Sequence, residues 1–282
     1  MVQKVWLITG IARGLGHALA KAALAKGDLV IGTTRRGEQP LGLAANNLTV
    51  LPLEMTHRDQ IARSVTAAFA RHGRIDVIVN NAGYGLLGSI EASTPDEADH
   101  VFAVNFFGPL ALIRAALPKL REQRRGHIVN ISSIAGVAPT PGAGLYAATK
   151  SALEGMSYSL AQEVAPFGIW VTVVNPGAFR TEFLSSRSVL RTSHSIDDYA
   201  VTSGRAVDGL LTKDGQQLGD PDRGATAIME AVLSDEPPLN LVLGSDALDR
   251  ARVRLDRFEE DLTRWEILTR STDFTAQAGA SR

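Results

Sequence analysis

The chain has 282 residues, 45% of them hydrophobic, which is enough to bury a large core within one α/β domain. Its 29 Lys and Arg residues nearly balance its 30 Asp and Glu residues, so no general basic field exists to attract nucleic acid or an anionic membrane. Cysteine is absent, and the six histidines form no HExxH motif, so disulfides, thiolate chemistry and a metal site are not expected. A small molecule is the expected partner.

The amino-terminal residues lead directly into an apolar run, without the long apolar core and cleavage site of a signal peptide. No apolar run approaches the roughly 18 residues of a membrane span. We therefore expect a cytoplasmic protein that does not enter a membrane.

Short apolar runs alternate with longer segments of helical period, which is typical of β-α units repeated around a parallel sheet. The fold class predicted is α/β, a Rossmann-like, doubly wound sheet of seven parallel strands. The expected strands are 4–9, 29–34, 48–53, 75–79, 127–131, 170–175 and 240–243. The expected helices are 15–26, 57–71, 95–105, 109–124, 147–165 and 221–234.

Two segments depart from this alternation. Residues 183–219 are rich in Ser, Thr, Asp and Gly with weak periodicity, which predicts a substrate lid or a disordered loop, and we favour the lid. Residues 247–269 are charged with recurring apolar positions, which predicts an amphipathic helix packed on the domain or on a partner subunit. The expected organisation is a catalytic domain over residues 1–245 and a helical extension over 246–282, whose last dozen residues are expected to fray.

The first strand is followed by a glycine-rich segment, Thr9–Gly16 (TGIARGLG). Glycines at this turn let the backbone approach a pyrophosphate, and the helix that follows presents free N–H groups and the positive end of its dipole. A glycine loop alone is a weak signal, because a tight turn needs the same residues.

A second pattern joins Tyr146 and Lys150 (YAATK), whose i, i+4 spacing places both side chains on one face of a helix. Such a pair is common, and by itself it is equally well read as a half-buried aromatic residue beside a solvated lysine. Its value rises because Ser133, at the end of an apolar strand, precedes Tyr146 by thirteen residues.

Together these motifs resemble the short-chain dehydrogenase/reductase family, in order and over about residues 3–245. The remaining matching segments are Asn80–Gly83 (NNAG) after the fourth strand, Asn105 within VNFFG, and Asn175–Gly177 (NPG) with Thr181. Five motifs in the same order are very unlikely to arise by chance.

The resemblance implies a hydride transfer between a nicotinamide cofactor and a carbonyl or alcohol carbon, with the catalytic residues Asn105, Ser133, Tyr146 and Lys150. Ser133 and Tyr146 would hydrogen-bond the substrate oxygen, and Tyr146 would exchange its proton. Lys150 would lower the pKa of Tyr146 and bind the ribose, while Asn105 would hold a proton-relay water. Leu86 and Val137, after the fourth and fifth strands, would give the substrate an apolar surface.

The end of the second strand indicates the form of the cofactor. An NAD enzyme of this type carries an acidic residue there, whereas this chain has Thr34 followed by Arg35, and Arg13 adds a cation in the glycine loop. NADP(H) is therefore expected, although the arginines are also compatible with simple solvation. The complete set of expected cofactor contacts is Gly10, Arg13, Gly14, Leu15, Gly16, Thr34, Arg35, Glu54, Met55, Asn81, Ala82, Gly83, Tyr146, Lys150, Pro176, Gly177 and Thr181.

One departure from the family is Glu54, which stands where an aspartate usually contacts adenine. The lid and the carboxy-terminal extension make the chain similar to hydroxysteroid-dehydrogenase-like members. The family also implies a homo-dimer or homo-tetramer formed through helices 109–124 and 147–165. The alternative function is a catalytically silent NADP(H) sensor, because dinucleotide-binding folds also host non-catalytic proteins.

Overall fold

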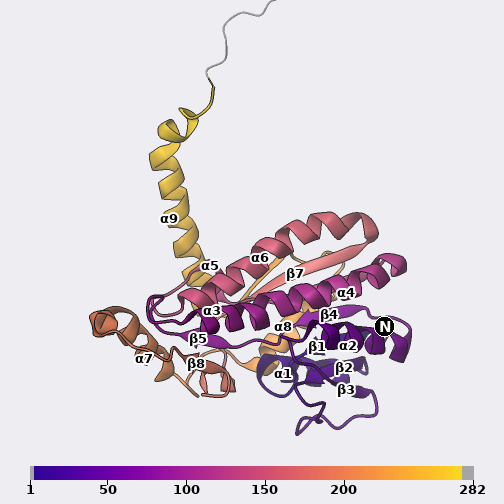
Figure 1. Ribbon diagram of the computed structural model, residues 1–282. Coiled ribbons are helices and arrows are strands. Elements are labelled where there is room, and N and C mark those ends of the chain that lie inside the picture. Colours follow the sequence, from indigo (N-terminus) through magenta and orange to yellow (C-terminus); the bar gives the residue numbers. More distant parts are fainter. Residues whose placement is uncertain (1–2, 275–282) are drawn as a thin grey trace, which may run out of the picture.

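A computed structural model describes residues 3–274 and confirms the predicted fold class, with seven parallel strands in the order β3-β2-β1-β4-β6-β7-β9 (Figure 1). These strands are β1 (Val5–Thr9), β2 (Leu29–Thr34), β3 (Leu48–Pro52), β4 (Val77–Asn80), β6 (Gly126–Ile131), β7 (Ile169–Pro176) and β9 (Asn240–Leu243). Each lies within two residues of its expected bounds. The long helices around them are α1 (Gly14–Ala25), α2 (Arg58–His72), α4 (Gly108–Gln123), α6 (Gly144–Val164) and α8 (Pro221–Val232).

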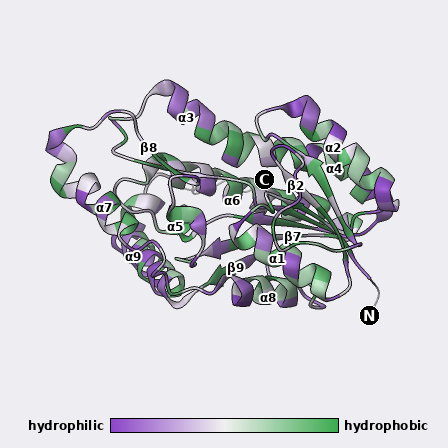
Figure 2. Ribbon diagram, turned by 90° about the horizontal axis from the view of Figure 1, so that it is seen from below, coloured by the Kyte–Doolittle hydropathy of each residue, from purple (hydrophilic) through white to green (hydrophobic). Residues whose placement is uncertain are grey.

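Helices cover both faces of the sheet, as Figure 2 shows, with α2 and α4 on one side and α1 and α8 on the other. Alternate residues of a strand point to opposite faces, so Leu7 of β1 packs in the core under α2, α4 and α6, whereas Ile8 packs in the core under α1 and α8. Both cores are apolar, which explains why the strands are hydrophobic on both sides.

The strand order reverses between β1 and β4, since the chain continues outward through β2 and β3 and then returns to β4 on the other side of β1. In open α/β sheets this reversal leaves a crevice at the carboxyl ends of the strands, where ligands bind. The segments that follow β1, β4, β6 and β7 all start at that edge.

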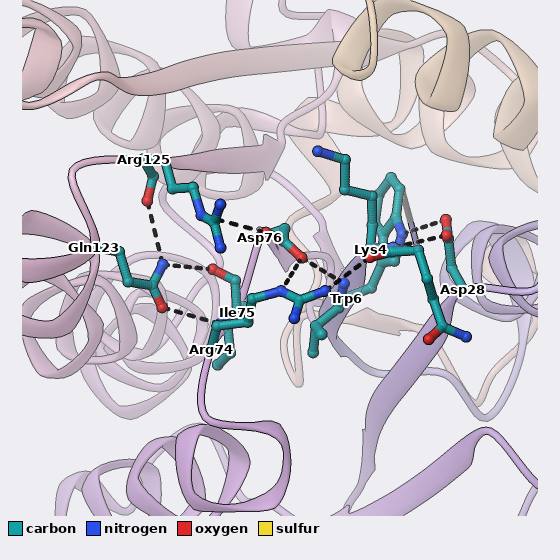
Figure 3. A network of polar contacts seen from close by, with 10 residues as sticks. Lys4, Trp6, Asp28, Arg74, Ile75, Asp76, Gln123 and Arg125 are labelled. Carbon is teal, nitrogen blue, oxygen red and sulfur yellow. Dashed lines mark hydrogen bonds and ion pairs between the residues drawn. The ribbon is translucent and has the colours of Figure 1, made fainter. Parts of the chain in front are cut away.

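The opposite edge of the sheet is held by two carboxylates (Figure 3). Asp28 accepts hydrogen bonds from the backbone N–H of Lys4 and from the indole Nε1 of Trp6, each at 2.9 Å. Asp76 accepts from the backbone N–H of Val5 at 2.8 Å and from Arg74 Nε at 3.1 Å. These bonds join the amino ends of neighbouring strands, so this edge has a structural role.

The two helices expected at 95–105 and 109–124 form one continuous run. It comprises α3 (Pro95–Phe102), a π-helical turn η1 (Ala103–Phe107) and α4. Pro109 suggests a helix start because it has no N–H to donate, but here the chain reaches it through i→i+5 bonds, such as Gly108 N–H to Ala103 O. A capping box formed by Thr94 and Glu97 starts the run.

The joined helix, Pro95–Gln123, is 29 residues long and contains a window of mean hydropathy 1.6, which is long and apolar enough to cross a membrane. The expectation that no segment approaches a membrane span was therefore wrong for length and composition. Its apolar side is used in the core, where Leu112, Ile113 and Leu120 are fully buried against the sheet.

The segment 183–219 is an ordered, mostly irregular structure and not a disordered loop. Its elements are η3 (Glu182–Leu184), β8 (Val189–Arg191), η4 (Asp197–Tyr199), η5 (Ala200–Gly204) and α7 (Arg205–Leu211). Strand β8 pairs with the unpredicted β5 (Gly85–Leu87), and Val189 and Val207 pack with Leu87 in a small core of their own. Long-range packing thus orders residues whose own sequence shows little periodicity.

The expected carboxy-terminal helix is present as α9 (Ser245–Arg270), but it does not lie along the domain. Only its first turns are buried, through Ala247 and Ala251, which pack on α5 (Ile134–Val137). From Arg252 onward every residue of the helix is exposed, and Figure 1 shows it projecting away from the sheet. Most of the frayed tail expected after this helix falls outside the described residues.

Candidate active site

The glycine loop after β1 is held open by backbone conformations and hydrogen bonds. Gly10 and Gly14 have φ angles of 73° and 63°, which side chains rarely allow. Asn81 donates from Nδ2 to the carbonyls of Thr9 and Gly10 at 2.8 and 3.1 Å. A Cβ at Gly16 would lie 2.2 Å from that same Nδ2, so the loop requires glycine there.

The loop therefore fits a dinucleotide. It provides a glycine-rich turn leading into the amino terminus of α1, and the amide of Asn81, just after β4, fixes its shape. Thr181 lies on the other side, 3.7 Å from where a Cβ of Gly14 would stand. Two expected cofactor segments, separated by more than 160 residues in sequence, thus meet across the crevice.

Tyr146 and Lys150 lie on the first two turns of α6, and both are buried, with exposed fractions of 8% and 5%. Lys150 Nζ donates to the carbonyl of Ile131 at 2.9 Å and lies 5.7 Å from the centre of the Tyr146 ring. Ser133 caps α5, and its hydroxyl lies close enough to the Tyr146 side chain to lower the pKa of the tyrosine. The three residues of the expected catalytic group therefore lie together where β6 ends.

Burial controls the protonation of this group. It raises the pKa of Tyr146 to about 12, against a lowering effect of the hydrogen bond with Ser133. It lowers the pKa of Lys150 to about 8, while the nearby carboxylate of Glu154 acts in the opposite direction. The phenol form of Tyr146 is thus strongly favoured, in contrast to the lowered pKa that the resemblance implies.

Asn105 lies in the π-helical turn η1 and is 1% exposed. Its Nδ2 donates to Tyr84 O at 2.8 Å and to Thr149 Oγ1 at 3.2 Å, and its Oδ1 accepts from Tyr84 N at 3.0 Å. A Cβ on Gly83 would lie 3.0 Å from Asn105 Oδ1 and 3.7 Å from Lys150 Nζ. The expected relay residue is therefore beside Lys150, with only the glycine of the NNAG motif between them.

A buried glutamate that was not expected, Glu154, helps to position Ser133 and Lys150. Glu154, one turn after Lys150, accepts hydrogen bonds at Oε1 from Ser132 Oγ and Asn175 Nδ2, each at 2.6 Å. Asn175 also donates to the carbonyl of Ser133 at 3.1 Å. Glu154 thus links the ends of β6 and β7, and a carboxylate at i+4 from Lys150 in an apolar helix was the signal that could have found it.

The segment after β7 is held by the start of α9. Asp246 Oδ2 accepts from the backbone N–H of Ala178 at 2.9 Å, and a Cβ on Gly177 would lie 2.3 Å from Asp246 Oδ1. The Gly177 N–H donates to Leu243 O at 2.8 Å. Pro176 and Gly177, both expected to contact the cofactor, thus owe their position to residues nearly 70 places later, which sequence spacing could not indicate.

At the end of β2, Thr34 is buried and donates from Oγ1 to the carbonyl of Glu38 at 3.1 Å and to its carboxylate at 3.4 Å. Arg13 donates to Ser188 Oγ at 2.8 Å and to Arg187 O at 2.7 Å. The pKa of Arg13 is lowered by burial and then by the charges of Arg35 and Arg187, while Glu182 opposes this. Three arginines therefore gather at the mouth of the crevice, one of them from the segment 183–219.

Several other expected contacts have different surroundings. Met55 is buried in the core, with its side chain and its carbonyl oxygen beside Gly108, and the Glu54 N–H donates to Gln60 Oε1. Leu86 packs with Tyr84 and Val101. Val137 packs with Ile134, Ala247 and Ala251 at the base of α9.

Phe183 is an aromatic residue that contacts Tyr146. Its ring centre is 5.9 Å from that of Tyr146, and it also packs on Leu87 and Val189. Phe183 follows Thr181 by two residues, so its closeness to the last motif was the sequence signal that could have predicted its place in the site. The position of Phe183 makes it a better candidate for a substrate contact than Val137.

Comparison with known proteins agrees with this geometry. The short chain dehydrogenase family matches residues 4–189. A 3-ketodihydrosphingosine reductase from Bacteroides thetaiotaomicron is 35% identical over 244 residues, covering 86% of this chain and 89% of that protein. The chain belongs to the short-chain dehydrogenase/reductase family.

Two solved structures extend the comparison. A short-chain dehydrogenase from Streptomyces avermitilis superimposes with a TM-score of 0.90 at 42% identity, covering 97% of this chain and 100% of that one. ElxO with NADP bound superimposes with a TM-score of 0.72 at 27% identity, covering 88% and 100%. The protein is therefore an oxidoreductase of this family that uses a nicotinamide cofactor and acts on a small-molecule substrate.

Proposed function

We propose that the protein is an NADP(H)-dependent reductase or dehydrogenase that interconverts a ketone and a secondary alcohol on a small, apolar substrate. The observation that carries the proposal is the buried group of Ser133, Tyr146 and Lys150, placed beside the glycine loop and the Gly177 segment. When bound, the cofactor supplies the hydride that is added to or removed from the substrate carbon.

In reduction, the hydroxyls of Ser133 and Tyr146 donate hydrogen bonds to the substrate oxygen and polarise the carbonyl. Tyr146 then transfers its phenolic proton to that oxygen. The raised pKa of Tyr146, about 12, keeps it in the phenol form that reduction requires at the start of a turnover. The positive charge on Lys150 favours the phenolate that remains, and Asn105 positions the groups around Lys150.

The arginines at the mouth of the crevice support NADP(H) over NAD(H). Arg13, Arg35 and Arg187 lie near one another, and a 2′-phosphate gains charge-assisted hydrogen bonds from such a cluster. Two carboxylates oppose this choice, because Glu38 stands beside Thr34 and Glu182 lies near Arg13. The three cations outnumber these two carboxylates, and the relative that binds NADP is consistent with the choice.

The apolar substrate rests on Phe183 and Leu87, which pack beside the reacting end of the site. The named reductase relative acts on a ketone in a long-chain molecule. A steroid ketone, suggested by the resemblance to hydroxysteroid-dehydrogenase-like members, is the second class of substrate to test.

The experiment follows NADPH oxidation with a panel of steroid ketones, long-chain 3-ketones and small aryl ketones. We expect turnover with at least one of them, and Tyr146→Phe should bind NADPH but lose at least about 10²-fold in kcat. Tyr199→Phe is the matched control, because its hydroxyl bonds only the exposed Glu91. Cofactor binding without turnover on the whole panel would favour the sensor, and near-normal turnover in Tyr146→Phe would refute the acid/base role.

A further inference from the structure

Helix α9 carries an apolar stripe with the spacing of a coiled coil, and the stripe is exposed except at its base, where Ala251 packs on α5. Its residues are separated by alternating steps of three and four, and they are Leu248, Ala251, Leu255, Phe258, Leu262 and Trp265. This period of 3.5 keeps a stripe on one side of two helices that wind around each other. We call these six residues the seam.

Among residues 3–274, nothing covers the part of the seam from Leu255 to Trp265. Leu255, Phe258, Leu262 and Trp265 are 59%, 49%, 47% and 51% exposed, although they are large apolar side chains. The base of the helix is fixed to the domain by Ala247 and Ala251 and by a hydrogen bond from Arg250 to the carbonyl of Ala138. The domain thus holds the helix in place while the seam above it stays open (Figure 1).

Charged residues flank the seam, and their sign changes along the helix. Arg252 and Arg254 lie beside its first half, and Glu259 and Asp261 hold the equivalent positions one heptad later. The Arg254 guanidinium lies 5.5 Å from the Phe258 ring, which places it at the edge of the seam. Within residues 3–274, these four side chains form no ion pair with any other residue.

We propose that the seam binds the seam of a second copy of this chain, with the two helices antiparallel. Placing Leu255 against Phe258 of the second copy centres the pair on the exposed part of the seam, and Leu262 of that copy then reaches the edge of the domain, where α5 already covers Ala251. The same register brings Arg252 beside Glu259 of the second copy, and Arg254 beside its Asp261. All four flanking contacts are attractive.

Other arrangements of the two helices place like charges beside each other. A parallel pair brings Asp261 beside Glu266 of the second copy, and an antiparallel pair shifted by one heptad brings Glu259 beside itself. The antiparallel arrangement has two-fold symmetry, so the same patch is used on both copies. It joins two domains at the helices whose first turn, through Asp246, holds the Gly177 segment.

The test exchanges charges and measures molar mass in full-length protein by sedimentation or light scattering. Arg252→Glu with Arg254→Glu makes every flanking contact of a homo-pair repulsive, and Glu259→Arg with Asp261→Arg does the same with the opposite sign. Each double variant should have half the molar mass of the wild type, and a mixture of the two should regain the full mass. The control, Arg257→Glu with Glu260→Arg on the side away from the seam, should match the wild type.

Circular dichroism and NADPH binding should show that every variant is folded. A monomeric wild type at tens of micromolar, unchanged mass in both double variants, a halved mass in the control, or no recovery on mixing would each overturn the proposal. Oligomers formed through the family's α4 and α6 surface alone would give unchanged masses.

A second measurement fixes the orientation, since the chain has no cysteine to interfere. Leu262→Cys should not form a disulfide with itself, because eleven residues along the axis, or about 16 Å, separate the two sites in the antiparallel pair. A mixture of Leu255→Cys and Phe258→Cys should cross-link. Rapid self-linking of Leu262→Cys would indicate a parallel pair and refute the proposed arrangement.

Discussion

Replacing Asp246 by alanine should loosen the segment that follows β7 without touching the catalytic group. The change removes the carboxylate that accepts from the Ala178 N–H at 2.9 Å and that lies directly beside Gly177. That N–H would lose its acceptor, and Gly177 would lose the side chain that limits its movement. This segment, which is expected to contact the cofactor, would then be less well ordered before the cofactor arrives.

A hydrogen bond to a charged group contributes about 1.5–3 kcal/mol, and the partial exposure of Asp246 favours the lower end. About 1.5 kcal/mol corresponds to roughly a tenfold change, so Asp246→Ala should raise the Kd for NADPH about tenfold, with a similar loss in kcat/KM. Fluorescence titration and steady-state kinetics measure the two effects.

Two further variants separate this role from general damage to α9. Asp246→Asn keeps an oxygen acceptor and should recover most of the NADPH affinity, whereas Asp249→Ala, on the exposed side of the same turn, should behave as the wild type. Wild-type NADPH affinity and kcat/KM in a folded Asp246→Ala would refute the reasoning. Equal losses in Asp246→Ala and Asp249→Ala would point to the helix as a whole.

Two other predictions concern the cofactor and acid stability. Arg35→Ala should weaken NADPH about ten- to hundredfold while NADH changes little, and adding Thr34→Asp should reverse the preference; a wild type that prefers NADH would contradict the assignment. Burial lowers the pKa of His127 from 6.5 to about 4, so between these two pH values the unfolded chain binds a proton that the folded chain does not. The free energy of unfolding should therefore decrease as the pH is lowered from about 6.5 to about 4, by up to about 3 kcal/mol. The pH dependence of urea unfolding should lose that component in His127→Gln, and an identical dependence in both proteins would show that His127 does not titrate in this way.

Local pattern was sufficient for most of the elements. Apolar runs predicted the seven sheet strands, and i, i+4 spacing correctly placed Tyr146 and Lys150 on one helix face. Local pattern failed at Pro109, where the π-helical turn at Asn105 carries the helix through a residue that usually begins one. It also failed for residues 183–219, whose order comes from packing on β5 and not from their own periodicity.

The resemblance of five motifs supplied the expected roles of Asn105, Ser133 and Tyr146, and the fold brings these residues together. Glu154, which helps to hold the expected catalytic residues in place, belongs to none of these motifs. Glu154 connects Ser132 with Asn175, which is visible only when β6 and β7 lie side by side. Val137 was expected at the substrate, but it packs under α9, because the short helix α5 turns it toward Ala247.

The sequence by itself determined the fold class, the glycine loop, the catalytic spacing and the amphipathic character of the last helix, because each depends on the period of a single strand or helix. Tertiary structure alone decided that Asp246 reaches Ala178, that Arg13 meets Ser188, and that α9 leaves the domain with most of its seam exposed. Those contacts follow from the order of strands in the sheet. That order is set by the collective burial of apolar surface from the whole chain, so no local stretch encodes it.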